Sequence, residues 1–176
     1  DGTRQMVLYG NHGICPGADY PPDANTIVAD VCSGSGLPEV ENHAGYNYIL
    51  ESLAKAGIIA VSINANDLNC RRDRYNERAD LILRHLALWK GMNDGTLSGD
   101  PFGGKFAGRV DLSRIGLLGH SRGGEAVVRV PLRNTDPDFQ FEGIISLAPT
   151  DAEFGNQVAD TPLLMILPAA DGDVWS

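Results

Sequence analysis

One stretch of the sequence, residues 114–128 (RIGLLGHSRGGEAVV), constrains the fold more than any other. Residues 115–118 are an unbroken apolar run, which is typical of a fully buried strand, and residues 125–128 are typical of the start of a helix. The connection between them, Gly119-His120-Ser121-Arg122-Gly123, follows the pattern G-x-S-x-G. In so tight a turn, side chains two positions before and after the serine would collide, so glycine is needed at both and the serine backbone is strained. The stretch therefore predicts a strand, a sharp turn and a helix, with Ser121 at the carboxyl end of the strand.

The rest of the chain alternates between apolar runs of strand length and helical patterns. Strands are predicted at 6–9, 58–63, 115–118, 141–147 and 163–167, and helices at 41–56, at 77–89 and after Ser121. Gly57 is expected to cap the first helix, and Pro131 is expected to end the third one early. This alternation predicts an α/β fold, a mostly parallel, doubly wound sheet with helices on both faces. The length fits a single domain, residues 1–176.

Most of the chemically distinctive polar residues directly follow predicted strands. They are Asn11 and His12, residues 64–67, Ser121, Asp151 and Asp171. The carboxyl ends of parallel strands meet at one edge of the sheet, and ligands of open α/β sheets bind there. At that edge Ser121 would lie over the first turn of its helix, whose N–H groups and dipole can stabilise an oxyanion. The pattern predicts a nucleophilic serine, and an incidental serine in a glycine-rich connection is the alternative.

The charge pattern limits the partners of the chain. A formal net charge of −9 argues against nucleic acid and anionic membranes, because both require a basic surface. The sequence contains no run of about 18 apolar residues, so no membrane span is predicted. The chain opens on Asp1-Gly2-Thr3 with no signal peptide in view, which favours a segment of a longer chain.

The three cysteines favour a disulfide over a metal site. Cys15 and Cys32 flank a loop rich in proline, glycine and aspartate, and a bond between them would hold that loop in shape. Two unrelated buried thiols are the alternative, and Cys70 is left without an assigned partner. The sequence has no C-x-x-C pair, so no zinc site is predicted. A disulfide would imply an oxidising compartment.

With these motifs the chain resembles the α/β-hydrolase superfamily, over the part that runs from the third core strand of that fold (6–9) to the seventh (163–167). The stretch 119–125 (GHSRGGE) is similar to the turn that carries the catalytic serine in bacterial secreted esterases. It is also similar to that of chlorophyllases and of lipase/cutinase-like polyester hydrolases. The cysteine loop, the stretch 62–66 (SINAN) and the stretch 171–174 (DGDV) favour the bacterial secreted group. The resemblance implies a secreted or otherwise extracytoplasmic serine esterase.

The resemblance also assigns catalytic roles by position. Ser121 would be the nucleophile, and the backbone N–H groups of Arg122 and Asn11 would form the oxyanion hole. The implied substrate is a small-molecule or polymeric ester whose identity the sequence does not specify. The chemistry requires no metal and no organic cofactor.

The acid that orients the catalytic histidine would be Asp171, in the turn after the last predicted strand. Asp173 lies further along the same turn, and Asp151 closes the strand at 141–147, where some lipases carry their acid. Both stay open as alternatives. Each aspartate could instead serve only as a turn former that bonds its own backbone.

The catalytic histidine is the one element of the pattern without a suitable candidate. In this superfamily it follows the eighth strand, and the sequence ends at Ser176 before any such strand. His120 is expected to point back into the core, and His43 and His85 belong to predicted helices, which leaves His12 as the one histidine at the active edge. The first two strands of the usual sheet are also missing. We therefore expect a core segment of a longer hydrolase whose histidine lies elsewhere, and a non-catalytic binding or scaffold domain without a base is the alternative.

Overall fold

Five parallel strands form the sheet of the computed structural model, which describes residues 4–10, 41–69, 74–150 and 160–169. The strands are β1 (Arg4–Gly10), β2 (Ile59–Ile63), β3 (Val110–His120), β4 (Phe141–Leu147) and β5 (Leu163–Ile166). Their order across the sheet is β2-β1-β3-β4-β5, and every neighbouring pair is parallel. The chain thus builds outward from β1 in one direction with β2 and in the other with β3, β4 and β5. The predicted parallel α/β sheet is confirmed.

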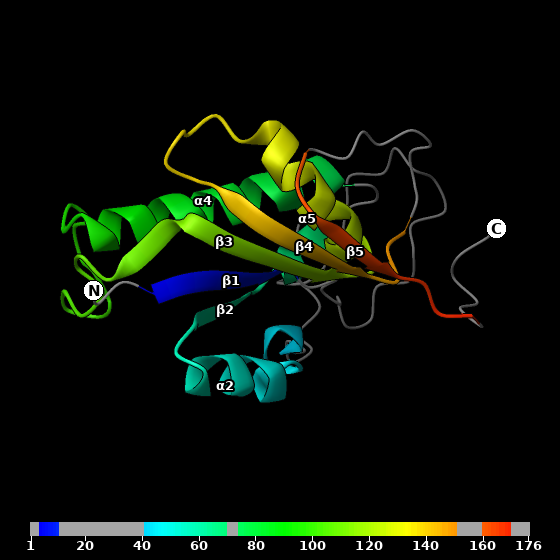
Figure 1. Cartoon of the computed structure of the whole chain (residues 1–176), viewed down its shortest axis with the longest axis horizontal. Helices are drawn as coiled ribbons and strands as arrows, with labels where there is room; N and C mark the ends of the chain where they lie inside the picture. Colours follow the sequence, from blue (N-terminus) through cyan, green and yellow to red (C-terminus); the bar gives the residue numbers. More distant parts are fainter. Residues whose placement is uncertain (1–3, 11–40, 70–73, 151–159, 170–176) are drawn as a thin grey trace.

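Helices lie on both sides of this sheet (Figure 1). The helices α4 and α5 cover one side and α2 lies on the other. The helical elements are η1 (Asn42–Ala44), α2 (Asn47–Lys55), α3 (Asn66–Asn69), α4 (Tyr75–Asn93) and α5 (Arg122–Arg133). Gly57 follows α2 with a φ of 86°, a conformation that glycine adopts without strain, so the predicted helix cap is confirmed.

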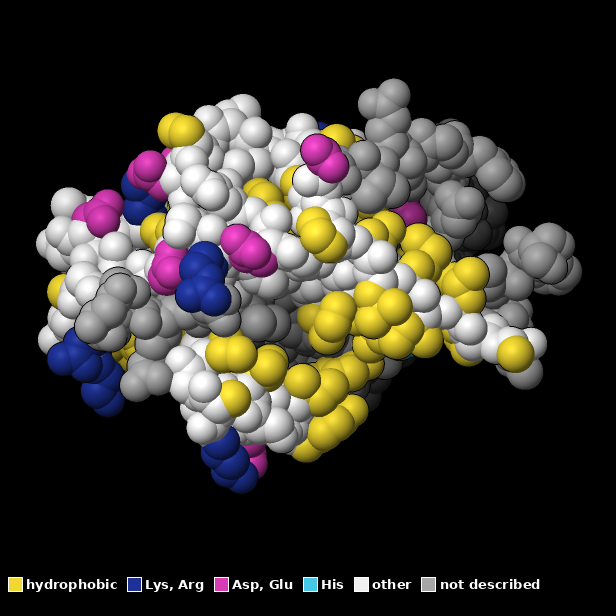
Figure 2. All heavy atoms as spheres, in the orientation of Figure 1, with side chains coloured by type: hydrophobic (Ala, Val, Ile, Leu, Met, Phe, Trp, Pro, Cys, Tyr) yellow, Lys and Arg dark blue, Asp and Glu magenta, His cyan; other side chains and the backbone are white. Residues whose placement is uncertain are grey.

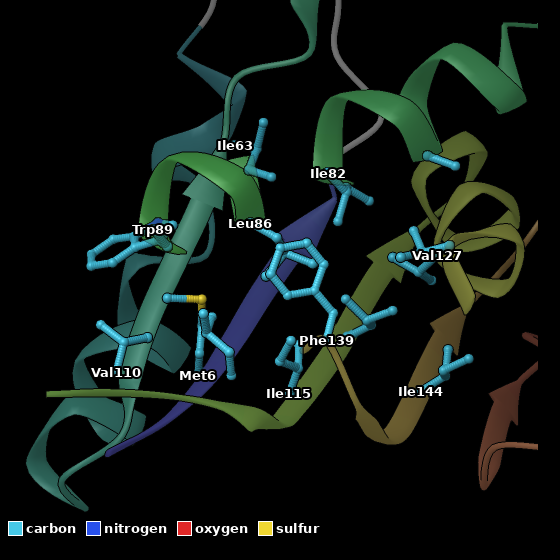
Figure 3. Close-up of a cluster of buried hydrophobic side chains, with 14 of the residues drawn as sticks. Met6, Ile63, Ile82, Leu86, Trp89, Val110, Ile115, Val127, Phe139 and Ile144 are labelled. Carbon is cyan, nitrogen blue, oxygen red and sulfur yellow. The ribbon is translucent and has the colours of Figure 1, made fainter. Parts of the chain in front are cut away.

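The hydrophobic core lies between the sheet and the pair α4 and α5 (Figure 3). We call this side of the sheet the covered face. In β3 the residues on this face include Ile115 and Leu117, which are 0% and 1% exposed. Leu118, the next residue along the strand, is only half-buried. This alternation follows from the period of two along a strand. Side chains of the other elements complete the layer, among them Met6, Ile82, Leu86, Val127, Val130 and Ile144.

Several element boundaries differ from the sequence-based expectation, among them the start of β3 and the end of α5. Strand β3 begins at Val110 because a register shift between Gln5 and Met6 lets β1 pair first with residues 110–111 and then with Ile115 onward. Helix α5 continues past Pro131 to Arg133, so the expected early end of this helix is wrong. The proline occupies the last turn, where only one hydrogen bond of the helix is lost. The backbone then becomes extended at Asn134.

Candidate functional site

The turn between β3 and α5, which we call the elbow (residues 119–123), has the strained serine that the sequence predicts. Ser121 has φ 55° and ψ −125°, and it is one of two non-glycine residues with positive φ in the described part of the chain. Its N–H donates to Leu147 O at 2.9 Å, and its carbonyl oxygen accepts from Glu125 N–H at 3.1 Å. Such a backbone costs on the order of 1–3 kcal/mol and persists only where surrounding contacts determine it. Strand β4 and the first turn of α5 supply those contacts.

Close contacts require Gly119 in the elbow and Gly124 directly after it. A Cβ at Gly119 would lie 2.2 Å from the carbonyl oxygen of Gly123, which no side chain can accommodate. A Cβ at Gly124 would lie 3.0 Å from Ser146 Oγ and 3.1 Å from Leu147 O. Ser146 Oγ also donates to the carbonyl oxygen of Gly124 at 3.0 Å, and both residues are buried. Gly119 and Gly124 therefore allow the start of α5 to contact β3 and β4.

The elbow lies where the strand order reverses. β1 is flanked by β2 on one side and by β3 on the other, and Gly10 at the end of β1 pairs with Gly119. In open parallel sheets the crevice at the carboxyl ends of two such strands is the usual ligand-binding position. Ser121 follows the end of β3 at this edge and is partly accessible. The topology alone thus places the serine at the expected binding position of the sheet.

Of the two predicted oxyanion donors, only Arg122 lies in the described part of the chain. Arg122 is the first residue of α5, a 12-residue helix, so its amide lies at the positive end of the helix dipole. Asn11 is outside the described residues. The residue before it, Gly10, is the last residue of β1 and lies beside the elbow.

The predicted acids and cysteines fall outside the described residues. This holds for Asp151, Asp171 and Asp173, and for Cys15, Cys32 and Cys70. The strands that precede the aspartates are described: β4 ends at Leu147 and β5 at Ile166, both at the same edge of the sheet as Ser121.

Three of the four histidines lie in described segments. His43 is in η1 and His85 in α4, where burial lowers the pKa of the His85 imidazole. His120 was expected to point into the core, and this is wrong. It is half-buried on the side of the sheet away from α4 and α5, with its ring centroid 6.4 Å from that of Tyr46, because β3 alternates and Gly119 takes the covered side. Among the described residues, no histidine hydrogen-bonds to Ser121 Oγ, and His12 is outside them.

Two features near the elbow were not anticipated from the sequence. Ala148, directly after β4, has φ 42° and donates its N–H to Ile166 O at 2.8 Å. Glu125 and Arg129 form a buried ion pair on α5, with Arg129 Nη2 2.7 Å from Glu125 Oε1. The i to i+4 spacing of opposite charges within an otherwise apolar helix was the available signal for the second feature. Nothing in the composition of residues 147–150 indicates the positive φ of Ala148.

The described residues contain no group of three or more side chains that could hold a metal ion. Within the same part of the chain, no helix has both the length and the apolar character that crossing a membrane requires. The sequence matches no protein-family model and none of the curated proteins with which it was compared.

Proposed function

We propose that the protein is a serine hydrolase that cleaves carboxylic esters through an acyl-enzyme, with Ser121 as the nucleophile. One observation carries the proposal. Ser121 has a strained backbone between a parallel strand and a helix, at the edge where the strand order reverses. This conformation raises the serine hydroxyl at the carboxyl end of the strand, beside the N-terminus of a helix. A serine that merely connected two elements would have no need of a conformation that costs free energy.

The proposed reaction has two halves. Ser121 Oγ attacks the ester carbonyl carbon while a histidine takes the hydroxyl proton, and the amides of Arg122 and Asn11 hold the oxyanion. The tetrahedral intermediate collapses, the alcohol leaves with the proton from the histidine, and the acyl group stays on Oγ. Water activated by the same histidine then releases the acid and restores the serine. Asp171 would orient the histidine, with Asp151 and Asp173 as alternatives.

The family assignment is part of the same proposal. The strands β1 to β5 would correspond to the third to seventh strands of an α/β-hydrolase core, and the group would be that of bacterial secreted serine esterases. Support comes from the GHSRGGE stretch and from the strand-turn-helix that contains it. A Cys15–Cys32 disulfide and an extracytoplasmic location belong to this proposal too. Mass spectrometry of a non-reduced digest tests the bond, and two separately alkylated peptides would exclude it.

The second candidate is a non-catalytic binding or scaffold domain that retains the elbow without a base. It is favoured by the placement of the described histidines. His43 and His85 belong to helical elements, and His120 packs beside Tyr46 on the other side of the sheet. A serine without a base within about 3 Å is a weak nucleophile. The catalytic proposal therefore needs a histidine outside the described residues, such as His12.

A fluorophosphonate probe separates the two candidates, because it reacts covalently with an activated serine. We expect the full-length protein to be labelled at Ser121, the segment 1–176 to react far more slowly, and Ser121→Ala to remain unlabelled. Labelling should coincide with loss of p-nitrophenyl acetate hydrolysis. A full-length protein that folds and does not react would support the non-catalytic domain. A segment that reacts as fast as the full-length protein would place the base within residues 1–176 and direct attention to His12.

A further inference from the structure

The ion pair between Glu125 and Arg129 lies inside the protein, one helical turn after the elbow. The two residues are 5% and 6% exposed. Arg129 donates from Nη2 and Nε to Glu125 Oε1, at 2.7 Å and 3.2 Å. The neighbouring residues of α5, Val127, Val128 and Val130, are buried as well. The pair is thus enclosed in an apolar part of the helix.

Stability alone does not account for a pair in this position. Removing two charges from water has a cost of several kcal/mol per ion, and apolar residues of similar size are often at least as stabilising as a buried ion pair. Valine, leucine or methionine would continue the apolar pattern of α5 at both positions. A buried pair is therefore weak evidence for a gain in stability, and its contacts are the better guide to its role.

Arg129 fixes the start of α4 against the elbow helix. Its Nη1 donates to Asn76 Oδ1 at 3.1 Å, and its guanidinium lies over the ring of Tyr75, 5.2 Å from the centroid. Tyr75 is 3% exposed, so this stack lies inside the protein. The planar guanidinium can pair with a carboxylate and stack on a ring at the same time, which lysine cannot do.

Both ends of this network reach the edge of the sheet at which Ser121 lies. At one end the backbone N–H of Glu125 donates to the carbonyl oxygen of Ser121. At the other end the hydroxyl of Tyr75 accepts a long hydrogen bond, 3.4 Å, from Thr150 Oγ1. Thr150 follows β4, the strand whose Leu147 carbonyl binds the N–H of Ser121. The network therefore joins the elbow, the start of α4 and the segment after β4.

We propose that Arg129 is a positioning residue for the nucleophile. Held by Glu125, it sets the start of α4 and, through Tyr75, the segment 148–150 relative to Ser121, so that the wall of the ester site beside β4 keeps its place during acylation. This inference rests on the proposed function, since it assigns Arg129 a role in the reaction of Ser121. Arg129 itself is buried and would act through its contacts with Glu125, Asn76 and Tyr75.

The chain offers a matched control in Arg133, one turn further along α5. Arg133 donates to the carboxylate of Asp80 from Nε and Nη2, at 2.7 Å and 2.8 Å. Asp80 is one turn after Asn76, so the two arginines join the same two helices in the same manner. The Arg133 bridge is solvent-exposed and further from the elbow. Removing it tests the loss of an α4–α5 bridge without the loss of the network at Ser121.

The experiment compares the double variant Glu125→Leu/Arg129→Met with Arg133→Met in the full-length protein. The double variant removes both charges of the pair together, so neither is left buried without the other, and we expect it to fold and melt close to the control. We expect it to lower the rate constant for fluorophosphonate labelling of Ser121 on the order of tenfold, because small misplacements of reacting groups have large effects on rate. The control should stay within about twofold, since exposed pairs contribute little. With p-nitrophenyl acetate the loss should fall on kcat and leave KM unchanged.

Hydrogen exchange provides a readout that does not depend on activity. Peptides covering residues 119–125 and 148–150 should exchange faster in the double variant than in Arg133→Met, and Tyr75→Phe should reproduce the effect for 148–150 alone. A double variant that labels as fast as the control, or that slows only in proportion to its unfolded fraction, would overturn the inference. If the parent protein does not react with the probe, the proposed function is wrong. The exchange rates then test the network independently of activity. Equal exchange in the double variant and in Arg133→Met would overturn the role proposed for Arg129.

Discussion

The two faces of the sheet are built differently, and the elbow belongs to only one of them. On the covered face α4 and α5 enclose the side chains of Ile115, Leu117 and Ile144, none of which is more than 1% exposed. The opposite side, which we call the open face, is covered within the described part of the chain by η1 and α2 near β2. Parallel sheets are usually buried on both faces. In the described part of the chain, helices cover one face of this sheet more fully than the other.

An apolar groove of about 680 Å³ runs along the open face. Ile49 and Leu53 of α2 line one side, and the lining residues from the sheet include Leu118, Ile145 and Leu164. Figure 2 shows apolar side chains gathered over α2 and β5 on this view of the molecule. The edge strand β5 is exposed over most of its length, with Leu164, Met165 and Ile166 between 45% and 55% exposed.

This difference shows which contacts create the geometry of Ser121. Gly119 turns toward the covered face, Gly124 packs on Ser146, and the Glu125–Arg129 pair joins α5 to α4. Each of these contacts lies on the covered side. The conformation of Ser121 should therefore depend on the covered face and be insensitive to changes on the open one.

The largest effect is expected for Gly119→Ala, compared with Gly143→Ala. A methyl group at Gly119 meets the backbone of Gly123 at 2.2 Å, whereas at Gly143 the nearest atom, Pro162 O, is 3.8 Å away. Overpacking against a backbone that cannot shift should destabilise the protein by about 3 kcal/mol or more. Gly143→Ala should change the free energy of unfolding by no more than about 0.5 kcal/mol. Urea unfolding measures both, and equal losses would show that the elbow is not the tight contact described.

Leu117→Ala and Leu118→Ala compare the two faces at adjacent residues of one strand. Leu117 is 1% exposed on the covered face, and Leu118 is half-buried beside the groove. Leu117→Ala should cost about 3 kcal/mol, within the usual range for a leucine truncated in a core. Leu118→Ala should cost about 1 kcal/mol, because less of its surface is removed from water. Chemical unfolding of the two variants gives the values directly. A loss at Leu118 as large as that at Leu117 would mean that the open face is fully covered in solution.

Ser121→Gly and Ser121→Ala measure the strain that the covered face imposes on the elbow. With φ 55° and ψ −125°, the backbone suits glycine, so Ser121→Gly should stabilise the protein by about 1 kcal/mol after the greater freedom of the unfolded chain is included. Ser121→Ala keeps the Cβ and should leave stability within about 0.5 kcal/mol of the parent. Both should abolish reaction with the fluorophosphonate. Thermal unfolding tests the order, and a glycine variant less stable than the alanine variant would contradict the strain.

The covered face could be predicted from the sequence largely because its signals are local. The run 115–118, the glycines of G-x-S-x-G and the strand at 141–147 each follow from nearest-neighbour sterics or from periodicity along one element. The strained turn at Ser121 belongs to this group. The strand boundary at Val110 could not be predicted, because it depends on a shift in pairing with β1, far away in the sequence. The prediction for His120 was wrong for a different reason: the alternation along β3 places Gly119 on the covered face, so His120 lies on the other face.

The network around Arg129 also depends on distant residues. The spacing of Glu125 and Arg129 indicates a pair on one helix. Tyr75 and Asn76, however, lie more than fifty residues before Arg129, and nothing local connects them to it. The open face is harder still. Leu118, Ile145 and Leu164 read as ordinary strand residues, and their partial exposure becomes evident only from the arrangement of the helices around the sheet.

The smallest effect concerns His85, at the border of the covered core on α4. Burial lowers the pKa of this imidazole below its usual value, because the charged form is disfavoured where water is excluded. The folded state therefore binds fewer protons than the unfolded state near the unfolded pKa of about 6.5. The contribution of His85 to the free energy of unfolding is fully present above that pKa. It is lost as the pH falls from there through the lowered pKa of the folded state, because protonation then favours the unfolded chain. In His85→Gln this part of the loss should be absent, so the difference in unfolding free energy between about pH 7.5 and about pH 5 should be smaller than in the parent. An identical pH dependence in the two proteins would mean that His85 is as accessible to water in the folded protein as in the unfolded chain, and that the covered face ends before it reaches this residue.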